Sequence, residues 1–270
     1  MLAVAKHVKI RNIPNYLLGR GEHAATTLQL QQLTGLNAHA LAVGMARLRV
    51  AGQMFTPAKG LHVVIAPEYR RWGAPPAADF IHPMMTVRRR DYYVAMLSAA
   101  ELHGAAHQRA QVMQVMVNRH VSDREFGRAR FRFFVGGHVT QVSVVMKNSD
   151  SGIFRVSSPE VTALDMASRP DDCGGVSNVA TAIFDLADGV GLQSSRLEQE
   201  ARHYSLATLR RLGWLLEFVD ADVDLGALER LLHDRPATRA TTLLDPGGAR
   251  QGKSNKRWRL VENSAVEPDL

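Results

Sequence analysis

Apolar positions at helical spacing, interrupted by polar residues, fill the first quarter of the chain. Residues 1–20 predict a helix that Pro14 weakens, with apolar side chains at Leu2, Val4, Val8, Ile10, Ile13 and Leu17. A second helix is expected over residues 28–33, with Thr26 or Thr27 as its cap and a stop at Gly35. Asn37 is the expected cap of a third helix, in which Leu41, Met45 and Leu48 share one buried face.

Two short alternating stretches follow the third helix, and a tight turn at Lys59-Gly60 joins them. The order helix, helix, turn, helix and hairpin is that of a winged helix-turn-helix. In such a module the last helix enters the major groove of DNA. Short helix pairs of this kind also occur as plain packing units, so that alternative stays open.

The third helix offers few long polar side chains on its outer face, which carries His39, Val43, Ala46 and Val50. Asn37, His39 and Arg47 can bond to base edges, and Val43 can contact a thymine methyl group. Arg49 and Lys59 suit phosphates. The predicted DNA-binding residues are Asn37, His39, Val43, Arg47, Arg49, Lys59 and His62. We expect modest base specificity and a large phosphate contribution.

The stretch EYRRWGAPPAADFIHP breaks the periodicity with prolines and small residues. It predicts a winged-helix domain over residues 1–72, a linker over 73–80 and a larger domain over 81–270. In the larger domain we expect helices over 92–103, 159–168, 176–189, 194–213 and 224–234, and strands over 112–118, 129–135, 140–145, 153–156 and 256–262. The predicted fold class is α+β, an N-terminal winged helix-turn-helix followed by a larger mixed α/β domain.

Charge is distributed unevenly along a chain whose net charge is +7. Residues 1–72 hold nine Lys and Arg against two Asp and Glu, whereas residues 148–234 hold seven against fifteen. A basic N-terminal part suits a polyanion such as nucleic acid, the alternative being a merely soluble basic surface. Lys6, Lys9 and Arg11 interrupt the apolar stretch that a signal peptide requires, and the sequence predicts no transmembrane helix. With a single cysteine, Cys173, these features lead us to expect a cytoplasmic protein.

Arginine-rich stretches in the larger domain predict a possible second nucleic-acid surface. In FGRARFRFF, strand alternation places the arginines on one face and the phenylalanines on the other. The candidate residues are Arg88, Arg89, Arg90, Arg128, Arg130, Arg132, Lys253 and Lys256. A solvated sheet face over a core is the competing interpretation. Trp258, in the basic tail stretch, is either a stacking residue or a buried one.

Enzymatic chemistry is weakly represented. His103 and His107 are spaced for zinc on one helix, but Gly104 separates them and no suitable third ligand is near. The acidic stretch DADVD lacks the glycine and glutamate of a calcium loop, and Asp224 is better explained as a helix cap. We therefore expect no metal, no cofactor and no catalytic site.

Four stretches of the larger domain resemble a known family when taken together and in order. They are YYVAMLSAAELHGAAHQ (92–108), GIFRVSSPEVTALDMASRP (152–170), LRRLGWLLE (209–217) and KRWRLVEN (256–263). The chain is similar over residues 22–263 to the AbiEi family of type IV antitoxins, which carry a winged helix before this domain. Val161 and Lys59 stand where the family pattern usually has arginine. These departures put in doubt only details of phosphate contacts and of ion pairing around Glu160.

The resemblance implies a cytoplasmic bacterial antitoxin that binds inverted repeats in its own promoter and represses it. It also implies that the protein counters a nucleotidyltransferase-like toxin without forming a stable complex. A monomer in solution would place two copies on each operator, because one winged helix covers one half-site. Two alternatives stay open: a ligand-responsive winged-helix transcription factor, and a nucleotidyl- or phosphotransfer enzyme with a regulatory domain.

Overall fold

The computed structural model describes residues 7–105, 110–234 and 241–269. The chain forms two compact units, each assembled from separate stretches of sequence. The first comprises Met1–Tyr92, Arg119–Phe133 and Met146–Arg155; the second comprises Tyr93–Asn118, Phe134–Val145 and Val156–Leu270. The division into residues 1–72, 73–80 and 81–270 stays a prediction from the sequence.

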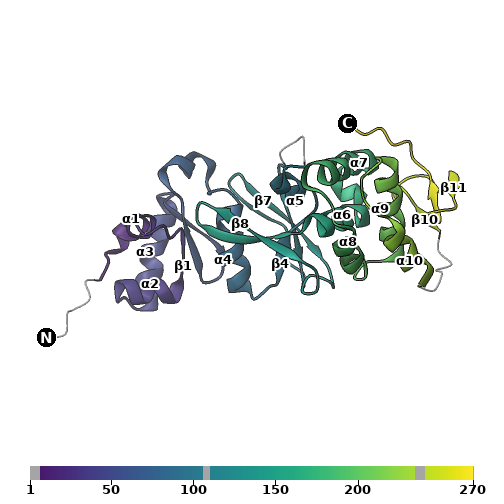
Figure 1. Cartoon of the computed structure of the whole chain (residues 1–270). Coiled ribbons are helices and arrows are strands. Elements are labelled where there is room, and N and C mark those ends of the chain that lie inside the picture. The colour runs from purple at the N-terminus through teal and green to yellow at the C-terminus, as the bar shows by residue number, and fades with distance from the viewer. Residues whose placement is uncertain (1–6, 106–109, 235–240, 270) are drawn as a thin grey trace. The chain divides into compact units, whose positions relative to one another are not determined.

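Helices and strands are mixed along the chain, as the predicted α+β class requires (Figure 1). The N-terminal part holds η1 (Ile10–Asn12), α1 (Ile13–Leu18), β1 (Ala24–Thr26), α2 (Thr27–Thr34), α3 (Ala38–Val50), β2 (Met54–Ala58), β3 (Leu61–Val64), η2 (Pro67–Trp72) and α4 (Ala78–Arg88). The central part holds β4 (Tyr92–Val94), α5 (Met96–His103), β5 (Met113–Val117), β6 (Arg124–Phe126), β7 (Ala129–Val135), β8 (Val144–Ser149) and β9 (Gly152–Ser157).

The remaining elements are mostly helical. They are α6 (Pro159–Ser168), η3 (Pro170–Cys173), α7 (Val176–Asp185), η4 (Leu186–Val190), α8 (Ser194–Ala201), α9 (Leu206–Phe218), α10 (Gly226–Asp234), β10 (Thr242–Leu243), β11 (Lys253–Asn255) and β12 (Leu260–Glu262). The described strands form three sheets, with orders β1-β3-β2, β6-β7-β5-β4-β9-β8 and β10-β12-β11. The first sheet is antiparallel, and Ala25 on β1 lies opposite His62 on β3.

The N-terminal helices pack around a small apolar core of their own. Leu41, Met45 and Leu48, the predicted inner face of α3, are all buried there. Ile13 and Leu17 of α1 and Leu30 of α2 belong to the same core, which also includes Ala25, Met54 and Val64. The predicted helix over residues 1–20 is shorter, since only η1 and α1 are helical among residues 7–20, and residues 1–6 lie outside the described part.

Helix α4 is one of the elements that the sequence pattern missed, and Pro83 in its interior explains why. A proline cannot donate to the carbonyl four residues earlier, here that of Asp79. The hydroxyl group of Ser151 donates to that carbonyl instead, so the helix continues through the proline. On the buried face of α4, Phe80 packs edge-on against Phe55 and Phe131, with ring centroids 5.2 and 5.3 Å apart. Helix α4 begins inside the stretch predicted as the linker.

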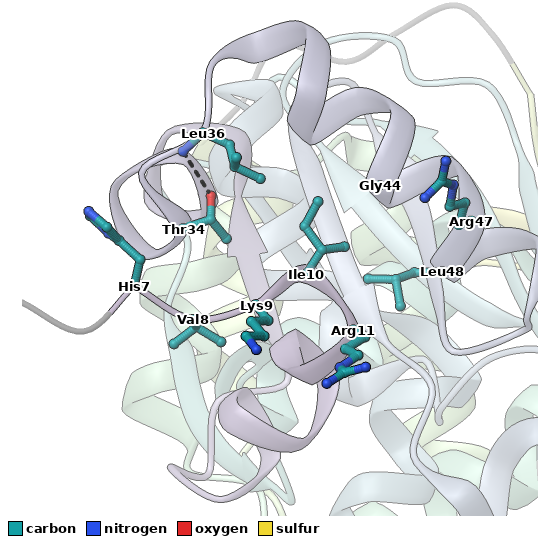
Figure 2. Close-up of a pocket in the computed structure, with 10 residues that line it drawn as sticks. All are labelled: His7, Val8, Lys9, Ile10, Arg11, Thr34, Leu36, Gly44, Arg47 and Leu48. Atoms are coloured by element: carbon teal, nitrogen blue, oxygen red, sulfur yellow. Dashed lines mark hydrogen bonds between the residues drawn. The ribbon is translucent and has the colours of Figure 1, made fainter.

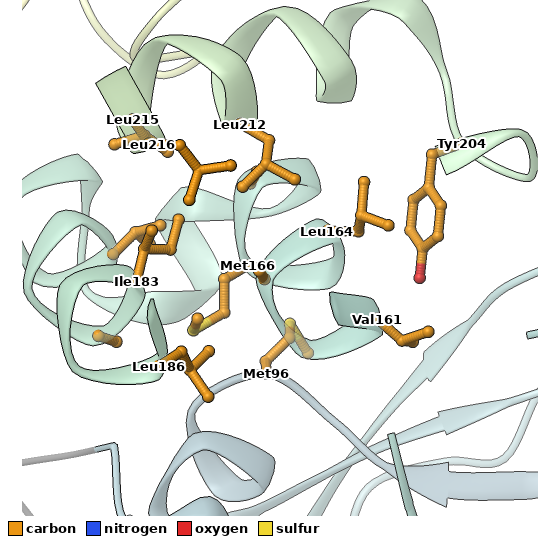
Figure 3. Packing of buried hydrophobic residues seen from close by; sticks show 14 of the residues in the cluster. Met96, Val161, Leu164, Met166, Ile183, Leu186, Tyr204, Leu212, Leu215 and Leu216 are labelled. Atoms are coloured by element: carbon orange, nitrogen blue, oxygen red, sulfur yellow. The ribbon is translucent and has the colours of Figure 1, made fainter. Parts of the chain in front are cut away.

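The second unit has the larger core, gathered around α6 (Figure 3). Leu164 and Met166 of α6 are fully buried with Ile183 of α7 and Leu212 of α9. The carboxylate of Asp165 is also fully buried and accepts hydrogen bonds from the hydroxyl groups of Tyr204, at 2.8 Å, and Tyr93, at 3.4 Å. This core packs helices from three of the four stretches that carry the family resemblance.

Several predicted boundaries in this part are wrong. The helix over 92–103 begins only at Met96, because Tyr92–Val94 forms β4. The helix over 194–213 is two helices, since the chain leaves α8 at Ala201 and Ser205 caps α9. The strand over 256–262 is shorter, and a turn separates β11 from β12. By contrast, the predicted limits 159–168 and 129–135 are those of α6 and β7.

Candidate nucleic-acid interface

Local sequence determines where α2 and α3 begin and end. The Thr26 hydroxyl accepts from the Gln29 N–H, and the Gln29 side chain accepts from the Thr26 N–H, which together form a capping box. Gly35 ends α2 with φ 68°, a left-handed conformation that favours glycine. The Asn37 side chain then accepts from the Ala40 N–H at 2.9 Å and caps α3. The predicted caps are confirmed, and they set the turn between the two helices.

Helix α3 buries one face and exposes the other. Arg47 and Arg49 are exposed, as is His39 in the first turn. Two valines also face outward, with Val43 42 % and Val50 91 % exposed. Val43, Ala46, Val50 and Ala51 line a shallow apolar hollow beside Arg47. The outer face of α3 therefore offers methyl groups with cations beside them, and its long polar side chains are His39, Arg47 and Arg49.

The segment before α1 packs on the buried side of α3 and leaves a cavity of about 630 Å³ next to it. A Cβ atom at Gly44 would lie 2.2 Å from Ile10 Cδ1, so glycine is what allows this close approach. Figure 2 shows Lys9 and Arg11 on the far side of Ile10 from Gly44. Both are exposed and line the same cavity as Arg47. Sequence reasoning missed them as candidate interface residues, although their charge in an apolar stretch was the available signal.

His62, predicted to contact DNA, is buried in the sheet of the N-terminal part. It is 8 % exposed, and its Nε2 lies 3.0 Å from the Thr27 hydroxyl, while Nδ1 lies 3.3 Å from that of Thr56. Burial, and then the positive charge of Arg49, lower the pKa of this imidazole. His62 thus supports the sheet, and we leave it out of the proposed interface. Lys59, in the β2–β3 turn, is exposed.

The three consecutive arginines at and after the end of α4 are not all exposed to solvent. Arg88 donates to the Pro57 carbonyl at 3.3 Å and is partly buried, which lowers its pKa. Arg90 folds back on the carbonyls of Arg88 and Arg89, at 3.3 and 3.2 Å. Only Arg89 of the three is exposed. Two of these predicted surface residues therefore serve the local structure of the first unit.

Of the three arginines predicted to line one face of a strand, only Arg130 and Arg132 lie on β7. Phe131 is buried while Arg130 and Arg132 are exposed, so the predicted alternation holds inside the strand. Arg128 lies in the preceding turn, where its guanidinium is 5.4 Å from the centre of the Trp72 ring. Arg130 pairs with Glu125, Nε to Oε1 at 3.3 Å. The paired carboxylate reduces the positive potential that this strand presents.

The C-terminal cations lie on and after a short strand of the second unit. Lys253 is on β11 and Lys256 in the turn that follows, and both are exposed. Trp258 is fully buried, which excludes it as a surface stacking residue. Its ring packs on Gly213 of α9, where a Cβ atom would lie 2.1 Å from the ring. The stretches LRRLGWLLE and KRWRLVEN are therefore in direct contact.

Other candidate chemistry has plain structural explanations. His103 Nε2 lies 2.8 Å from the Ser157 carbonyl, and its predicted zinc partner His107 falls outside the described residues. Burial raises the pKa of the Cys173 thiol to about 12. The Asp224 side chain accepts from the Gly226 N–H at the start of α10. Within the described ranges, no three His, Cys, Asp or Glu side chains are grouped so that they could hold a metal ion.

Among the residues that the structure describes, no helix is long and apolar enough to cross a bilayer.

Comparisons with known proteins fall on both units. A family model described as the AbiEi antitoxin C-terminal domain matches residues 93–218. The fold is similar to that of the RV2827C protein from Mycobacterium tuberculosis, with a TM-score of 0.64 and 13 % sequence identity, over 96 % of this chain and 93 % of that one. No curated protein matches the sequence. The match covers three of the four resembling stretches, almost all of the first and the whole of the next two, and ends before KRWRLVEN.

Proposed function

Residues 93–218 make this chain an AbiEi-family antitoxin, and on that premise we propose that it acts in a type IV toxin–antitoxin system with two separate roles. In one role it binds inverted repeats in its own promoter and represses its operon. In the other it counters a nucleotidyltransferase-like toxin without forming a stable complex. Both roles are those of a regulatory protein that works in the cytoplasm and catalyses no reaction.

DNA binding is assigned to the N-terminal elements, which we propose form a winged helix-turn-helix. The observation that carries this proposal is the outer face of α3, where exposed arginines flank a strip of methyl groups. Helix α3 would lie in the major groove, with Asn37, His39, Val43 and Arg47 nearest the bases. Arg49 and Lys59 would bind phosphates, and the exposed cations Lys9 and Arg11 join this set.

The predicted second nucleic-acid surface keeps only some of its cations exposed to solvent. Arg89, Arg128, Arg132, Lys253 and Lys256 are exposed and suit phosphate contacts. Arg88 and Arg90 bond to local carbonyls, and Arg130 pairs with Glu125. The charge available for sequence-independent binding is thus smaller than the sequence suggests. We propose that phosphate contacts outside α3 and the wing add affinity without base specificity.

Toxin neutralisation is assigned to the second unit. Its core packs α6 against α7 and α9 and includes the buried Tyr93, so the matched residues other than 119–133 and 146–155 form one structural body. We propose that antitoxicity depends on this body and is independent of the outer face of α3. Arg47→Glu should then abolish repression while growth rescue persists.

Co-expression with the neighbouring operon gene tests the proposal. The full chain should restore growth of cells that express the toxin, and the Arg47→Glu variant should restore it equally well. The Leu164→Asp variant, which places a charge in the core of the second unit, should fail to rescue and serves as the negative control. Absence of rescue by the full chain, expressed and folded, would contradict the antitoxin role.

A further inference from the structure

A pocket of about 300 Å³ lies in the first unit, away from the outer face of α3. Three stretches form its walls: residues 21–24 before β1, residues 78–83 of α4, and the turn between β8 and β9. Its acidic lining residues are Glu22 and Asp79, and no lysine or arginine lines it. In a chain with a net charge of +7, this pocket is a locally acidic environment.

Asp79 is the lining residue that has a buried polar atom without a partner in the described part of the chain. It is one of the residues that line the pocket, yet it is only 5 % exposed. Its Oδ2 atom is buried and has no hydrogen-bond partner among the described residues. A buried carboxylate oxygen without a donor is strongly unfavourable, so native proteins supply a partner or a ligand does. A pocket of this volume has room for far more than one water molecule.

Several hydrogen bonds hold the residues around Asp79 in place. The carbonyl of Asp79 accepts from the Ser151 hydroxyl, which fixes the turn between β8 and β9 on α4. The His23 carbonyl accepts from the Val64 N–H at 2.8 Å, which ties the opposite wall to β3. On the next turn of α4, His82 Nδ1 lies 3.2 Å from the Tyr92 hydroxyl. The pocket is therefore bounded by packed elements.

The chemistry of the lining selects the class of ligand. Burial first, and then the positive charge of Arg155, lower the pKa of His82, so this imidazole adds no positive charge at neutral pH. The hydroxyl groups of Ser149 and Ser151 already donate to the carbonyls of Gly152 and Asp79, so towards a ligand they are acceptors. The unpaired Asp79 oxygen and these hydroxyl groups suit a ligand with a positively charged N–H donor. Charge-assisted hydrogen bonds of this kind are the strong ones.

We propose that this pocket binds a small organic cation with a primary ammonium group, and that the unpaired oxygen of Asp79 accepts its N–H. The pocket lies against residues 21–24, which lead into β1 and the N-terminal sheet. The ligand would thus be bound next to the proposed DNA-binding elements. The inference rests on the geometry of the first unit and does not depend on the proposed function.

Isothermal titration of the full chain tests this site, with 1,4-diaminobutane as the probe and 1,4-butanediol as its neutral match. The diamine should bind saturably at one site, and the diol should not bind measurably. Asp79→Asn should weaken diamine binding about tenfold or more, the effect expected from losing a charged hydrogen bond. Asp222→Asn, the same exchange at an exposed acid of the second unit, is the matched control and should leave the affinity unchanged.

A second variant keeps the test decisive should Asp79→Asn fail to fold. Ala78→Leu retains Asp79 and adds bulk to the pocket wall, so it should also weaken diamine binding at least about tenfold. Saturable binding of the diamine that both variants leave unchanged would overturn the proposal. So would equal binding of diamine and diol, or the absence of any saturable site on the wild-type chain.

Discussion

His62 shows how burial converts a predicted ligand-binding residue into a structural one. Both ring nitrogens bond to threonine hydroxyls inside the N-terminal sheet, and burial together with Arg49 lowers the pKa of the ring. From the sequence, it is predicted as a DNA-binding residue. Only the pairing of β3 between β1 and β2 places this side chain inside. That pairing is not visible in the residues around position 62.

The lowered pKa of His62 predicts a pH dependence of stability. Below the ordinary value of 6.5 the unfolded chain binds a proton that the folded chain does not, so the free energy of unfolding falls as the pH falls. Urea unfolding at pH 7.5 and pH 5.5 measures this. His62→Gln should reduce the difference between the two pH values. His39→Gln, the same exchange at an exposed position, should not; an unchanged difference in His62→Gln would contradict the assignment.

Gly213 is the second residue whose neighbours give a sharp prediction. A Cβ atom there would lie 2.1 Å from the ring of the fully buried Trp258. Gly213→Ala should therefore lower the free energy of unfolding by about 1–3 kcal/mol, although alanine favours a helix. Urea unfolding measures the loss. Gly137→Ala, where no atom lies within 4 Å, should change stability by less than about 0.5 kcal/mol; equal effects would refute the packing.

Among the elements, those with strong local signals were the predictable ones. Capping residues and apolar spacing located α2, α3 and α6, because these signals act within a few residues. Helix α4 was missed because proline is ordinarily excluded from the interior of a helix. The Ser151 hydroxyl, which donates to the carbonyl that Pro83 leaves without a donor, comes from a turn distant in the sequence. Strand β4 was predicted as helix because three residues are too few to show the alternation of apolar and polar positions typical of a strand. Its pairing with β9 defines it as a strand. Long-range contacts decided both.

Asn37 allows the cap of α3 to be separated from a contact with DNA. Asn37→Ala should cost about 1 kcal/mol of stability, because the Ala40 N–H loses its acceptor. Asn37→Asp keeps that acceptor and should retain stability, yet its negative charge should weaken DNA binding. Thermal unfolding and fluorescence anisotropy on the upstream DNA measure the two effects. If Asn37→Asp binds DNA as tightly as the wild type, Asn37 does not face the DNA.

The exposed valines of α3 predict a preference for thymine methyl groups. Replacing thymine by uracil in the upstream DNA removes only those methyl groups from the major groove. Binding should weaken by about fourfold for each contacted methyl, the value expected for burying one such carbon. Val43→Ala should remove most of this difference, whereas Val190→Ala, also at an exposed valine, should preserve it. Tight binding that is identical for both DNAs would exclude methyl contacts while leaving the proposed DNA binding intact.

At the scale of the whole molecule, the two compact units are not consecutive along the chain. Residues 119–133 and 146–155 belong to the first unit although the sequence places them in the second domain. Phe131 from the later stretch completes the aromatic cluster of Phe55 and Phe80. Periodicity could not show this because it reports on neighbours along the chain. The family resemblance supplied the function class, and physical reasoning from the residues supplied the candidate surface.

The central claim is that the outer face of α3 and the β2–β3 turn bind the chain's own upstream DNA. The most direct measurement is its affinity for that DNA across a salt series, for the wild type and for Arg47→Glu and Lys59→Glu. Both variants should bind more weakly, with a logarithmic salt slope shallower by about one unit or more. Arg196→Glu, an exposed arginine of α8, is the control and should behave as wild type. If Arg47→Glu and Lys59→Glu leave both the affinity and the salt slope unchanged, α3 and the β2–β3 turn do not bind this DNA.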